Sequence, residues 1–431
     1  MSDINVAVNG DKFDLSQPIG DYSFTFKWLL DSLNENDEKF QKFHKNREIE
    51  KITFSDISDG QGYFSAVLRF IITFTDSSKA PSDDAYTTVL KIPGTVSFKK
   101  ANSKSGGNNE VFEAVANVAS IHQHECIFYN QIAPILEIPL PKVYKTVEID
   151  LQNLEGCIHM EDLSNLGKTL SYFESVNLTQ IKCLIQTLAH MHKNLLTTDD
   201  AIWKNKFMKH QRGFADITTF FEDLIEPFLQ KCKRRNAFEQ YLEKYRKFAF
   251  NKDYMIYVHQ QSHQDLEISP VIVHGDIKSG NILFSIDANG DIQNGIASII
   301  DWQVLREGSP MYDLAYFLVH NTDGVVRRQA EVFAIQYYHE CLVKEFDGDK
   351  SKVPYTIEQL KHSYNYVFLT QAFFIPFLAV FMFNGMESKI KSQSLKDAFF
   401  DFITLKSLHA YEDADRLLKN EMKQVFEKYN N

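Results

Sequence analysis

The sequence predicts an α+β protein in which a small antiparallel sheet with one important helix precedes a larger, mainly helical region. Between residues 51 and 92, short apolar and β-branched runs alternate with turn residues, a pattern that favours neighbouring antiparallel strands. After about residue 163, apolar residues recur at helical spacing instead. The 431 residues are sufficient for two lobes of this kind.

Three segments are expected along the chain. Residues 1–50 are predicted to form an N-terminal helical extension, because Phe24 and Trp28 belong to an apolar pattern with near-helical spacing. Residues 51–163 are predicted to form the N-terminal lobe, which ends in an acidic, hinge-like connector. Residues 164–431 are predicted to form the C-terminal lobe, with a polar loop and most of the helices.

Composition excludes several classes of protein. Hydrophobic residues make up 44% of the chain and charged residues 24%, as in globular proteins that bury a large core. The net charge of −11, from 46 basic and 57 acidic residues, argues against a nucleic-acid-binding protein. The longest apolar run, residues 372–383, is too short to span a bilayer.

The cysteines favour a reducing compartment. There are five, an odd number, and no two are close in sequence. This pattern argues against a disulfide framework, a zinc site or a disulfide-linked partner. Residues 1–20 contain no apolar signal segment. A cytoplasmic location is therefore expected.

A turn with two glycines lies between two strand-like stretches of the predicted N-terminal lobe. Gly60 and Gly62 separate the strands expected at residues 52–54 and 65–74. Backbone N–H groups in such a turn can approach phosphate oxygens, so both glycines are candidate nucleotide-binding residues. Any hairpin can carry two glycines, and an ordinary turn is the alternative.

Lys91 and Glu125 are a candidate ion pair in the same lobe. Lys91 interrupts an apolar, β-branched strand, and Glu125 lies on the apolar face of a helix expected at about residues 110–133. A buried carboxylate needs a partner, and Lys91 is the best candidate. The alternative is that Lys91 is an edge-strand charge that faces the solvent. A strand lysine paired with a helix glutamate positions ATP phosphates in kinases.

The most informative stretch is residues 274–303. Two apolar runs, at 282–286 and 296–300, are predicted strands, and Asn289-Gly290 is the expected turn between them. A hairpin brings its outer ends together, so Asn281 is expected beside Asp301. An amide and a carboxylate in that place can both offer oxygen to a divalent cation.

Asp276, five residues before Asn281, completes a pattern typical of phosphoryl transfer. In that chemistry one aspartate receives a hydroxyl proton, and an asparagine and a second aspartate hold magnesium. The alternative is three unrelated polar residues at the ends of a hairpin. Lys278 could contact the transferred group. Asp313 could either cap its helix or hydrogen-bond the loop that carries Asp276.

These motifs together resemble one family. The residues that carry the resemblance are His274-Gly275-Asp276, Asn281, Ile300-Asp301-Trp302-Gln303, Ser309-Pro310, Asp313-Leu314 and Glu161-Asp162-Leu163. They are similar to the ecdysteroid-kinase-like (CHK-kinase-like) proteins of insects and nematodes, which are relatives of choline kinases and aminoglycoside phosphotransferases. The resemblance covers roughly residues 50–410.

The resemblance implies a two-lobed protein-kinase-like fold, ATP with Mg²⁺, and phosphorylation of a small-molecule hydroxyl. Lys91 would hold ATP phosphates, Glu125 would orient Lys91, and the backbone from Glu161 to Leu163 would meet the adenine. In the loop, the candidate catalytic residues are His274, Lys278 and Asp276, the last as the base. Asn281 and Asp301 would bind the metal. Position 278 is often Trp in this family, so Lys278 is a departure from its pattern.

Two rival functions are considered. A protein kinase is disfavoured, because Asp313 lies only twelve positions after Asp301, which leaves no room for an activation segment. A catalytically inactive, kinase-like ligand-binding protein is the second rival. The sequence does not identify the acceptor, which could be a sterol-like, choline-like or xenobiotic alcohol.

Overall fold

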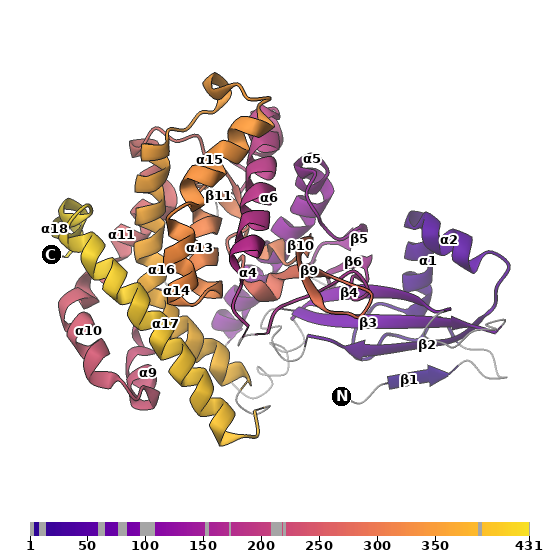
Figure 1. The fold of residues 1–431 in the computed structure, drawn as a ribbon. Coiled ribbons are helices and arrows are strands. Elements are labelled where there is room, and N and C mark those ends of the chain that lie inside the picture. The colour runs from indigo at the N-terminus through magenta and orange to yellow at the C-terminus, as the bar shows by residue number, and fades with distance from the viewer. Residues whose placement is uncertain are drawn as a thin grey trace. The chain divides into compact units, whose positions relative to one another are not determined.

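The computed structural model contains two compact units (Figure 1). It describes residues 4–7, 14–58, 65–75, 84–94, 108–150, 155–171, 174–207, 218, 221–386 and 390–430. The first unit comprises Met1–Asn130 and Leu140–Asn165, and the second comprises Gln131–Pro139 and Leu166–Asn431. The predicted nucleotide-binding residues Gly60 and Gly62 lie outside the described residues.

The first unit is built on an antiparallel sheet of six strands. Their spatial order is β1 (Ile4–Ala7), β2 (Ile49–Asp56), β3 (Ser65–Phe74), β4 (Tyr86–Pro93), β6 (Cys157–Glu161) and β5 (Val143–Val147). Burial alternates along β3, where Leu68, Phe70, Ile72 and Phe74 are all buried. This period of two places the apolar residues of β3 on one face of the sheet.

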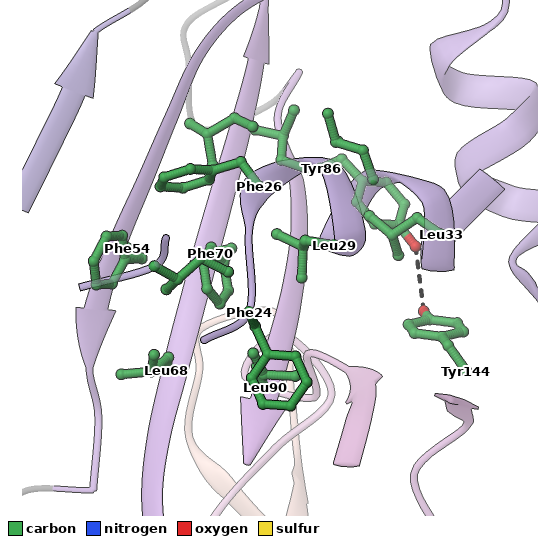
Figure 2. Close-up of a cluster of buried hydrophobic side chains, with 14 of the residues drawn as sticks. Phe24, Phe26, Leu29, Leu33, Phe54, Leu68, Phe70, Tyr86, Leu90 and Tyr144 are labelled. Carbon is green, nitrogen blue, oxygen red and sulfur yellow. Dashed lines mark hydrogen bonds between the residues drawn. The ribbon is translucent and has the colours of Figure 1, made fainter. Parts of the chain in front are cut away.

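Two N-terminal helices, α1 (Phe26–Asn36) and α2 (Glu38–His44), belong to the core of this unit. Phe26, Leu29 and Leu33 pack in the same cluster as sheet residues such as Phe70 and Leu90 (Figure 2). The residues that the sequence assigned to an extension are therefore part of the hydrophobic core of the N-terminal sheet. The reason is that the apolar stripe of α1 covers the apolar face of the sheet.

The first unit also contains α4 (Asn108–Ile127), the helix expected from the sequence at about residues 110–133. A π-helical segment, Phe128–Ile132, continues it, and α5 (Ala133–Leu136) follows. Residues 131–139 belong to the second unit, although in the sequence they precede β5 and β6, which are strands of the first unit.

The second unit is mainly helical (Figure 1). Its longer helices are α6 (Leu178–Thr197), α10 (Arg235–Ala249), α13 (Tyr312–Asn321), α14 (Gly324–Glu331), α15 (Ala334–Glu345), α16 (Ile357–Met386) and α17 (Gln393–Lys419). The shorter ones are α7 (Asp200–Trp203), α9 (Ile225–Lys231), α11 (Lys252–Ile256), α12 (Ser262–Asp265), α18 (Lys423–Tyr429) and a π-helical turn at Tyr257–Gln261. The apolar run of residues 372–383 lies within α16, where residues 372–377, 380 and 383 are buried.

Two small antiparallel sheets carry the polar loop of the second unit. In the first, β9 (Ile282–Ile286) lies between β10 (Ile292–Ile299) and β7 (Gly167–Lys168). Ile282 faces Ile299, so β9 and β10 form the hairpin that the sequence predicted. In the second, β8 (Val271–Val273) pairs with β11 (Arg306–Gly308).

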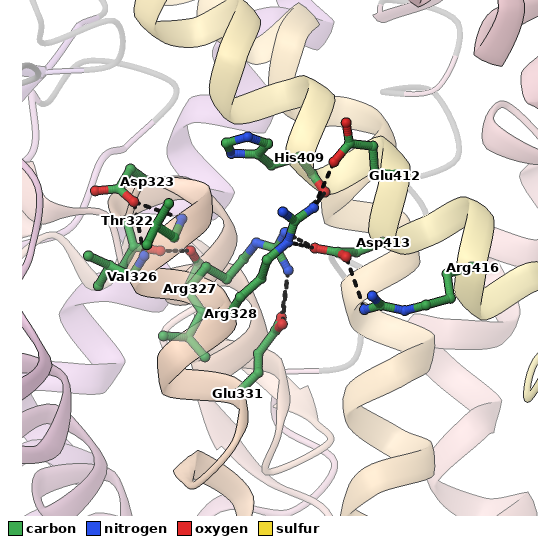
Figure 3. Close-up of polar contacts among 12 residues, drawn as sticks. Thr322, Asp323, Val326, Arg327, Arg328, Glu331, His409, Glu412, Asp413 and Arg416 are labelled. Carbon is green, nitrogen blue, oxygen red and sulfur yellow. Dashed lines mark hydrogen bonds and ion pairs between the residues drawn. The ribbon is translucent and has the colours of Figure 1, made fainter.

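A buried ion cluster joins α14 to α17 (Figure 3). Arg327 and Arg328 of α14 both bond to the carboxylate of Asp413 in α17. Arg327 also pairs with Glu331 at 2.8 Å, and Arg416 lies 2.9 Å from the second oxygen of Asp413. Because Arg327 and Asp413 are buried, each charge depends on its partners, and the cluster fixes α14 against α17.

These elements confirm the α+β, protein-kinase-like fold class predicted from the sequence: an antiparallel sheet with one key helix, and a mainly helical remainder. In the parts of the chain that the structure describes, every helix is too short or too polar to cross a membrane. All five cysteines are free thiols.

Candidate active site

The loop that carries Asp276 is anchored by Asp313, in the first turn of α13. The two carboxylate oxygens of Asp313 accept hydrogen bonds from the backbone N–H groups of His274, at 2.8 Å, and Gly275, at 3.0 Å. Of the two roles considered for Asp313, contact with the loop is therefore the one observed. Asp313 is fully buried, and burial raises the pKa of its carboxyl.

Only glycine fits at position 275. Its φ of +86° lies in the left-handed region. A Cβ atom there would lie 2.4 Å from Nη1 of Arg306 and 2.5 Å from the carbonyl oxygen of Val304. The His-Gly-Asp motif therefore contains its glycine because the backbone passes close to another segment.

His274 ties the loop to the end of the hairpin. It is fully buried, its Nδ1 accepts the N–H of Asp276 at 3.2 Å, and its Nε2 lies 2.9 Å from the carbonyl oxygen of Ile300. These partners assign the proton to Nε2. Because both ring nitrogens bond to the backbone, the placement of His274 fits a role in orienting Asp276 rather than contact with a substrate.

The carboxylate of Asp276 lies at the centre of a hydrogen-bond network. Its Oδ1 accepts from the hydroxyl of Tyr316 at 2.6 Å, and its Oδ2 accepts from Nζ of Lys278 at 2.7 Å. The amide Nδ2 of Asn281 lies 2.8 Å from the backbone oxygen of Asp276 and 3.3 Å from Oδ2. The side chains of Asp276 and Lys278 are 25% and 36% exposed, so both are accessible on the second unit.

Sequence reasoning missed two residues of α13 that contact this loop. Tyr316 bonds to Asp276, and Asn321 accepts the N–H of Ser279 at 2.6 Å and donates to the carbonyl oxygen of Ile277 at 3.2 Å. The available signal was spacing. Tyr316 lies three residues after Asp313, and residues three apart on a helix share a face.

Asn281 and Asp301 lie at neighbouring ends of the hairpin. The N–H of Ile300 donates to the carbonyl oxygen of Asn281 at 2.9 Å, which sets Asp301 beside Asn281 along the backbone. Asp301 has a φ of +68°, a conformation that aspartate tolerates better than most residues.

These two residues fit a magnesium ion. Nδ2 of Asn281 is bonded to Asp276, so the amide oxygen is the side-chain atom that could bind a metal. One carboxylate and one amide oxygen match Mg²⁺, which usually takes its other ligands from water and substrate phosphates. Within the described ranges, no group of three or more His, Cys, Asp or Glu residues could hold a metal by itself.

In the first unit, the expected ion pair between Lys91 and Glu125 is present. Nζ of Lys91, on β4, lies 2.8 Å and 2.7 Å from the two carboxylate oxygens of Glu125, on α4. The side chains are only 11% and 2% exposed. The alternative of a solvent-facing edge charge is therefore wrong, because strands β3 and β6 flank β4 on both sides.

The segment from Glu161 to Leu163 follows at the end of β6, next to β4 in the sheet. The backbone N–H of Glu161 donates to the carbonyl oxygen of Lys142 at 2.9 Å. The backbone N–H of Lys142 donates in turn to Oε1 of Glu161 at 2.7 Å. Asp162 accepts from Nε of Arg69 at 2.7 Å. Burial raises the pKa of Asp162, but hydrogen bonds from Ser164 and Arg69 outweigh burial and keep it below its ordinary value.

The structure thus groups the predicted residues into two sets. Lys91, Glu125 and the segment 161–163 lie on adjacent elements of the first unit, and His274, Asp276, Lys278, Asn281 and Asp301 lie on one loop and hairpin of the second. Two surface pockets of the second unit, of about 840 and 380 Å³, contain none of these residues. Side-chain geometry, rather than pocket size, therefore identifies the candidate site.

A comparison with known families identifies the family to which the chain belongs. The model of the DUF1679 family, described as "Uncharacterized oxidoreductase dhs-27", matches residues 35–420. The chain belongs to this family. The match spans the motifs through which the sequence resembles CHK-kinase-like proteins, and that resemblance is confirmed.

Two relatives from Caenorhabditis elegans are similar to this DUF1679 chain. "Uncharacterized oxidoreductase dhs-27" is 26% identical over 381 residues, which cover 86% of this chain and 44% of the relative. The chain therefore spans less than half the length of that relative. "Uncharacterized kinase-like protein D1044.1" is 22% identical over 330 residues, which cover 75% of this chain and 82% of the relative.

Solved structures show a distant likeness to the DUF1679 chain. A choline kinase from Cryptosporidium parvum has a TM-score of 0.49 and 11% identity, covering 94% of this chain and 99% of its own. A putative aminoglycoside phosphotransferase from Ralstonia eutropha has a TM-score of 0.44 and 14% identity, covering 90% and 98%. With TM-scores below 0.5, this likeness carries no information about the function of the chain.

Proposed function

We propose that the chain is an ATP-dependent phosphotransferase that moves the γ-phosphoryl group to a hydroxyl of a small molecule. The observation that carries this proposal is the placement of Asp276. Its carboxylate is accessible, while Asp313 and His274 hold the backbone around it. A general base needs both features, because it must reach a substrate and keep a fixed orientation.

In the proposed reaction, Asp276 accepts the proton of the acceptor alcohol. The alcohol oxygen bonds to the γ-phosphorus as the bond from that phosphorus to the β-phosphate oxygen breaks, which yields a phosphate ester and ADP. Lys278 and Lys91 would neutralise charge on the phosphates, and Glu125 would keep Lys91 in place. Mg²⁺, when bound at Asn281 and Asp301, would neutralise further phosphate charge.

The name of the longer relative raises oxidoreduction as a second candidate. A dinucleotide-binding domain needs a G-x-G-x-x-G turn in a parallel βαβ unit. The sequence contains no G-x-G-x-x-G, and every strand pairing in the described ranges is antiparallel. These observations favour phosphoryl transfer for this chain over hydride transfer.

A catalytically inactive, ligand-binding protein is the remaining candidate. The polar groups that phosphoryl transfer needs are all present in the chain, which favours an active enzyme. The test is ADP formation from Mg·ATP with a panel of amino alcohols, sterols and xenobiotic alcohols. Asp276→Asn serves as the matched control, because it keeps the shape and removes the base. We expect turnover with at least one acceptor that Asp276→Asn loses. Binding of Mg·ATP without turnover across the panel would favour the inactive protein.

A further inference from the structure

The two oxygens of the Asp276 carboxylate have different environments. Oδ1 accepts the hydroxyl of Tyr316, which is buried on α13. Oδ2 accepts Nζ of Lys278, whose side chain is 36% exposed, and lies 3.3 Å from Nδ2 of Asn281. Oδ1 therefore contacts a buried donor, whereas Oδ2 contacts the accessible ammonium of Lys278 and, at longer distance, the buried amide of Asn281.

The Tyr316 hydroxyl is a fixed donor. Its ring packs against the rings of His320 and Tyr312, with centroids 4.4 Å and 6.3 Å away. His320 lies 3.0 Å from Oε1 of Gln371, on α16, and Nε2 of Gln371 lies 3.4 Å from the hydroxyl of Tyr312. Two helices thus hold the ring in place, and the hydroxyl cannot move away from Oδ1 without disturbing them.

The surroundings keep Tyr316 uncharged and able to donate. Burial raises the pKa of Tyr316 well above its ordinary value, and the nearby charge of Asp276 raises it further. Burial also lowers the pKa of His320 to about 4, so its imidazole is neutral near pH 7. The neighbouring ring therefore adds no positive charge that would favour ionisation of the hydroxyl.

Lys278 differs from Tyr316, because it is a flexible donor at the surface. Its ammonium can exchange Oδ2 for another anion, such as a phosphate oxygen, at little cost, since exposed ion pairs contribute at most about 1 kcal/mol. When it does, Oδ2 keeps the longer contact of 3.3 Å with Nδ2 of Asn281 and can also accept a hydroxyl, whereas Oδ1 stays bonded to Tyr316.

We propose that Tyr316 is a positioning residue for the base: it occupies Oδ1 and fixes the plane of the carboxylate, so that Oδ2 takes the proton. This inference rests on the proposed phosphotransferase function. The acceptor hydroxyl gives its proton to Oδ2 as its oxygen bonds to the γ-phosphorus and ADP leaves. The protonated Asp276 then releases the proton to water, which restores the starting state.

The test is the kinetics of Tyr316→Phe, which removes the hydroxyl and keeps the ring. We expect kcat to fall by about 10- to 100-fold, as for other small misplacements of a catalytic group. The KM for ATP should stay within about twofold, because the removed hydroxyl bonds to the base rather than to a proposed nucleotide-binding residue. The thermal unfolding midpoint checks that the variant is folded.

Two further variants separate positioning from packing. Tyr338→Phe is the matched control: it removes a buried tyrosine hydroxyl on α15 that bonds to His192 rather than Asp276, and kcat should be unchanged. In an Asp276→Asn background, Tyr316→Phe should cause no further loss, because residues that act as a unit are not additive.

Each contrary outcome has a distinct meaning. An unchanged kcat in Tyr316→Phe, or the same fractional loss with and without Asp276, overturns the positioning role and leaves the phosphotransferase intact. The absence of turnover in the wild-type protein with every acceptor overturns the proposed function, and the positioning role with it.

Discussion

The charged groups of the two sets of candidate residues differ in their burial and in the number of their partners. In the first unit, Lys91 and Glu125 are both buried and face each other through two short contacts. In the second, Asp276 is partly exposed, and its carboxylate is shared among Tyr316, Lys278 and Asn281. The first set centres on a buried ion pair, and the second on a network that begins in a buried helix and ends at the surface.

This difference predicts whether each set contributes mainly to the stability of the fold or to turnover. Removal of one partner of a buried ion pair leaves a charge without compensation, so the free energy of unfolding should fall. Removal of a partly exposed group leaves its neighbours access to water, so turnover should fall while stability changes little. The following substitutions test that contrast.

The largest effect is expected for Glu125→Gln. This change leaves Lys91 buried opposite a neutral amide, so the free energy of unfolding should fall by about 3 kcal/mol. Urea unfolding followed by circular dichroism measures it. The surface pair of Lys27 with Asp31 is the matched control, and Asp31→Asn should change stability by less than about 0.5 kcal/mol. Equal effects at both positions would contradict the contrast.

Asp276→Asn should lower turnover and leave stability nearly unchanged, the reverse of the effect expected for Glu125→Gln. Turnover should fall by at least about 100-fold, because a general base contributes that much or more. The unfolding midpoint and the affinity for Mg·ATP should be nearly unchanged, which calorimetry and thermal unfolding can measure. A variant with normal turnover would remove Asp276 from the mechanism, and a strongly destabilised one would show that its network is mainly structural.

Asp301→Ala tests the metal site at the end of the hairpin. Asn281 remains as a neutral and weaker ligand, so the Mg²⁺-dependent affinity for ATP should fall by about 10- to 100-fold. Titration of the variant with ATP, with and without Mg²⁺, measures this dependence. If Mg·ATP binds with unchanged affinity, Asn281 and Asp301 do not hold the metal.

The smallest kinetic effect is expected for Lys278→Met. A cation that contacts the transferred group helps mainly in the transition state, so kcat should fall by about tenfold, or about 1.4 kcal/mol, while the KM for ATP barely changes. Steady-state kinetics with saturating acceptor measures both kcat and the KM for ATP. An unchanged kcat would place Lys278 outside the reaction, and a raised KM alone would limit it to nucleotide binding.

The sequence predicted the local features of the fold well. The hairpin of β9 and β10 follows from two apolar runs and an Asn-Gly turn, and both are set by neighbouring residues. The pairing of Lys91 with Glu125 followed from a charge on a strand and a charge on an apolar helix face. The hairpin signal lies within a few residues of the hairpin, whereas Lys91 and Glu125, 34 residues apart, were paired because each charge lies on an apolar element.

Two features that depend on distant parts of the chain were not predicted. Tyr316 contacts Asp276 from forty residues away, and nothing in the loop itself indicates this partner. The helices α1 and α2 looked like a separate extension because their apolar stripe does not reveal the sheet it covers. The roles of the site residues in binding and catalysis remain predictions.

The segment between Asp301 and Asp313 has a consequence for engineering. It is held at three places: at Ile300 by Asn281, at β11 by its register with β8, and at Asp313 by the loop. Its length is therefore fixed, and one inserted residue would shift the register of β11 or pull Asp313 away from the loop. The tip of the hairpin at Asn289 is exposed, and the N–H of Asn289 donates to Asp287 within the same turn, so an epitope tag or a fluorophore attachment site belongs there.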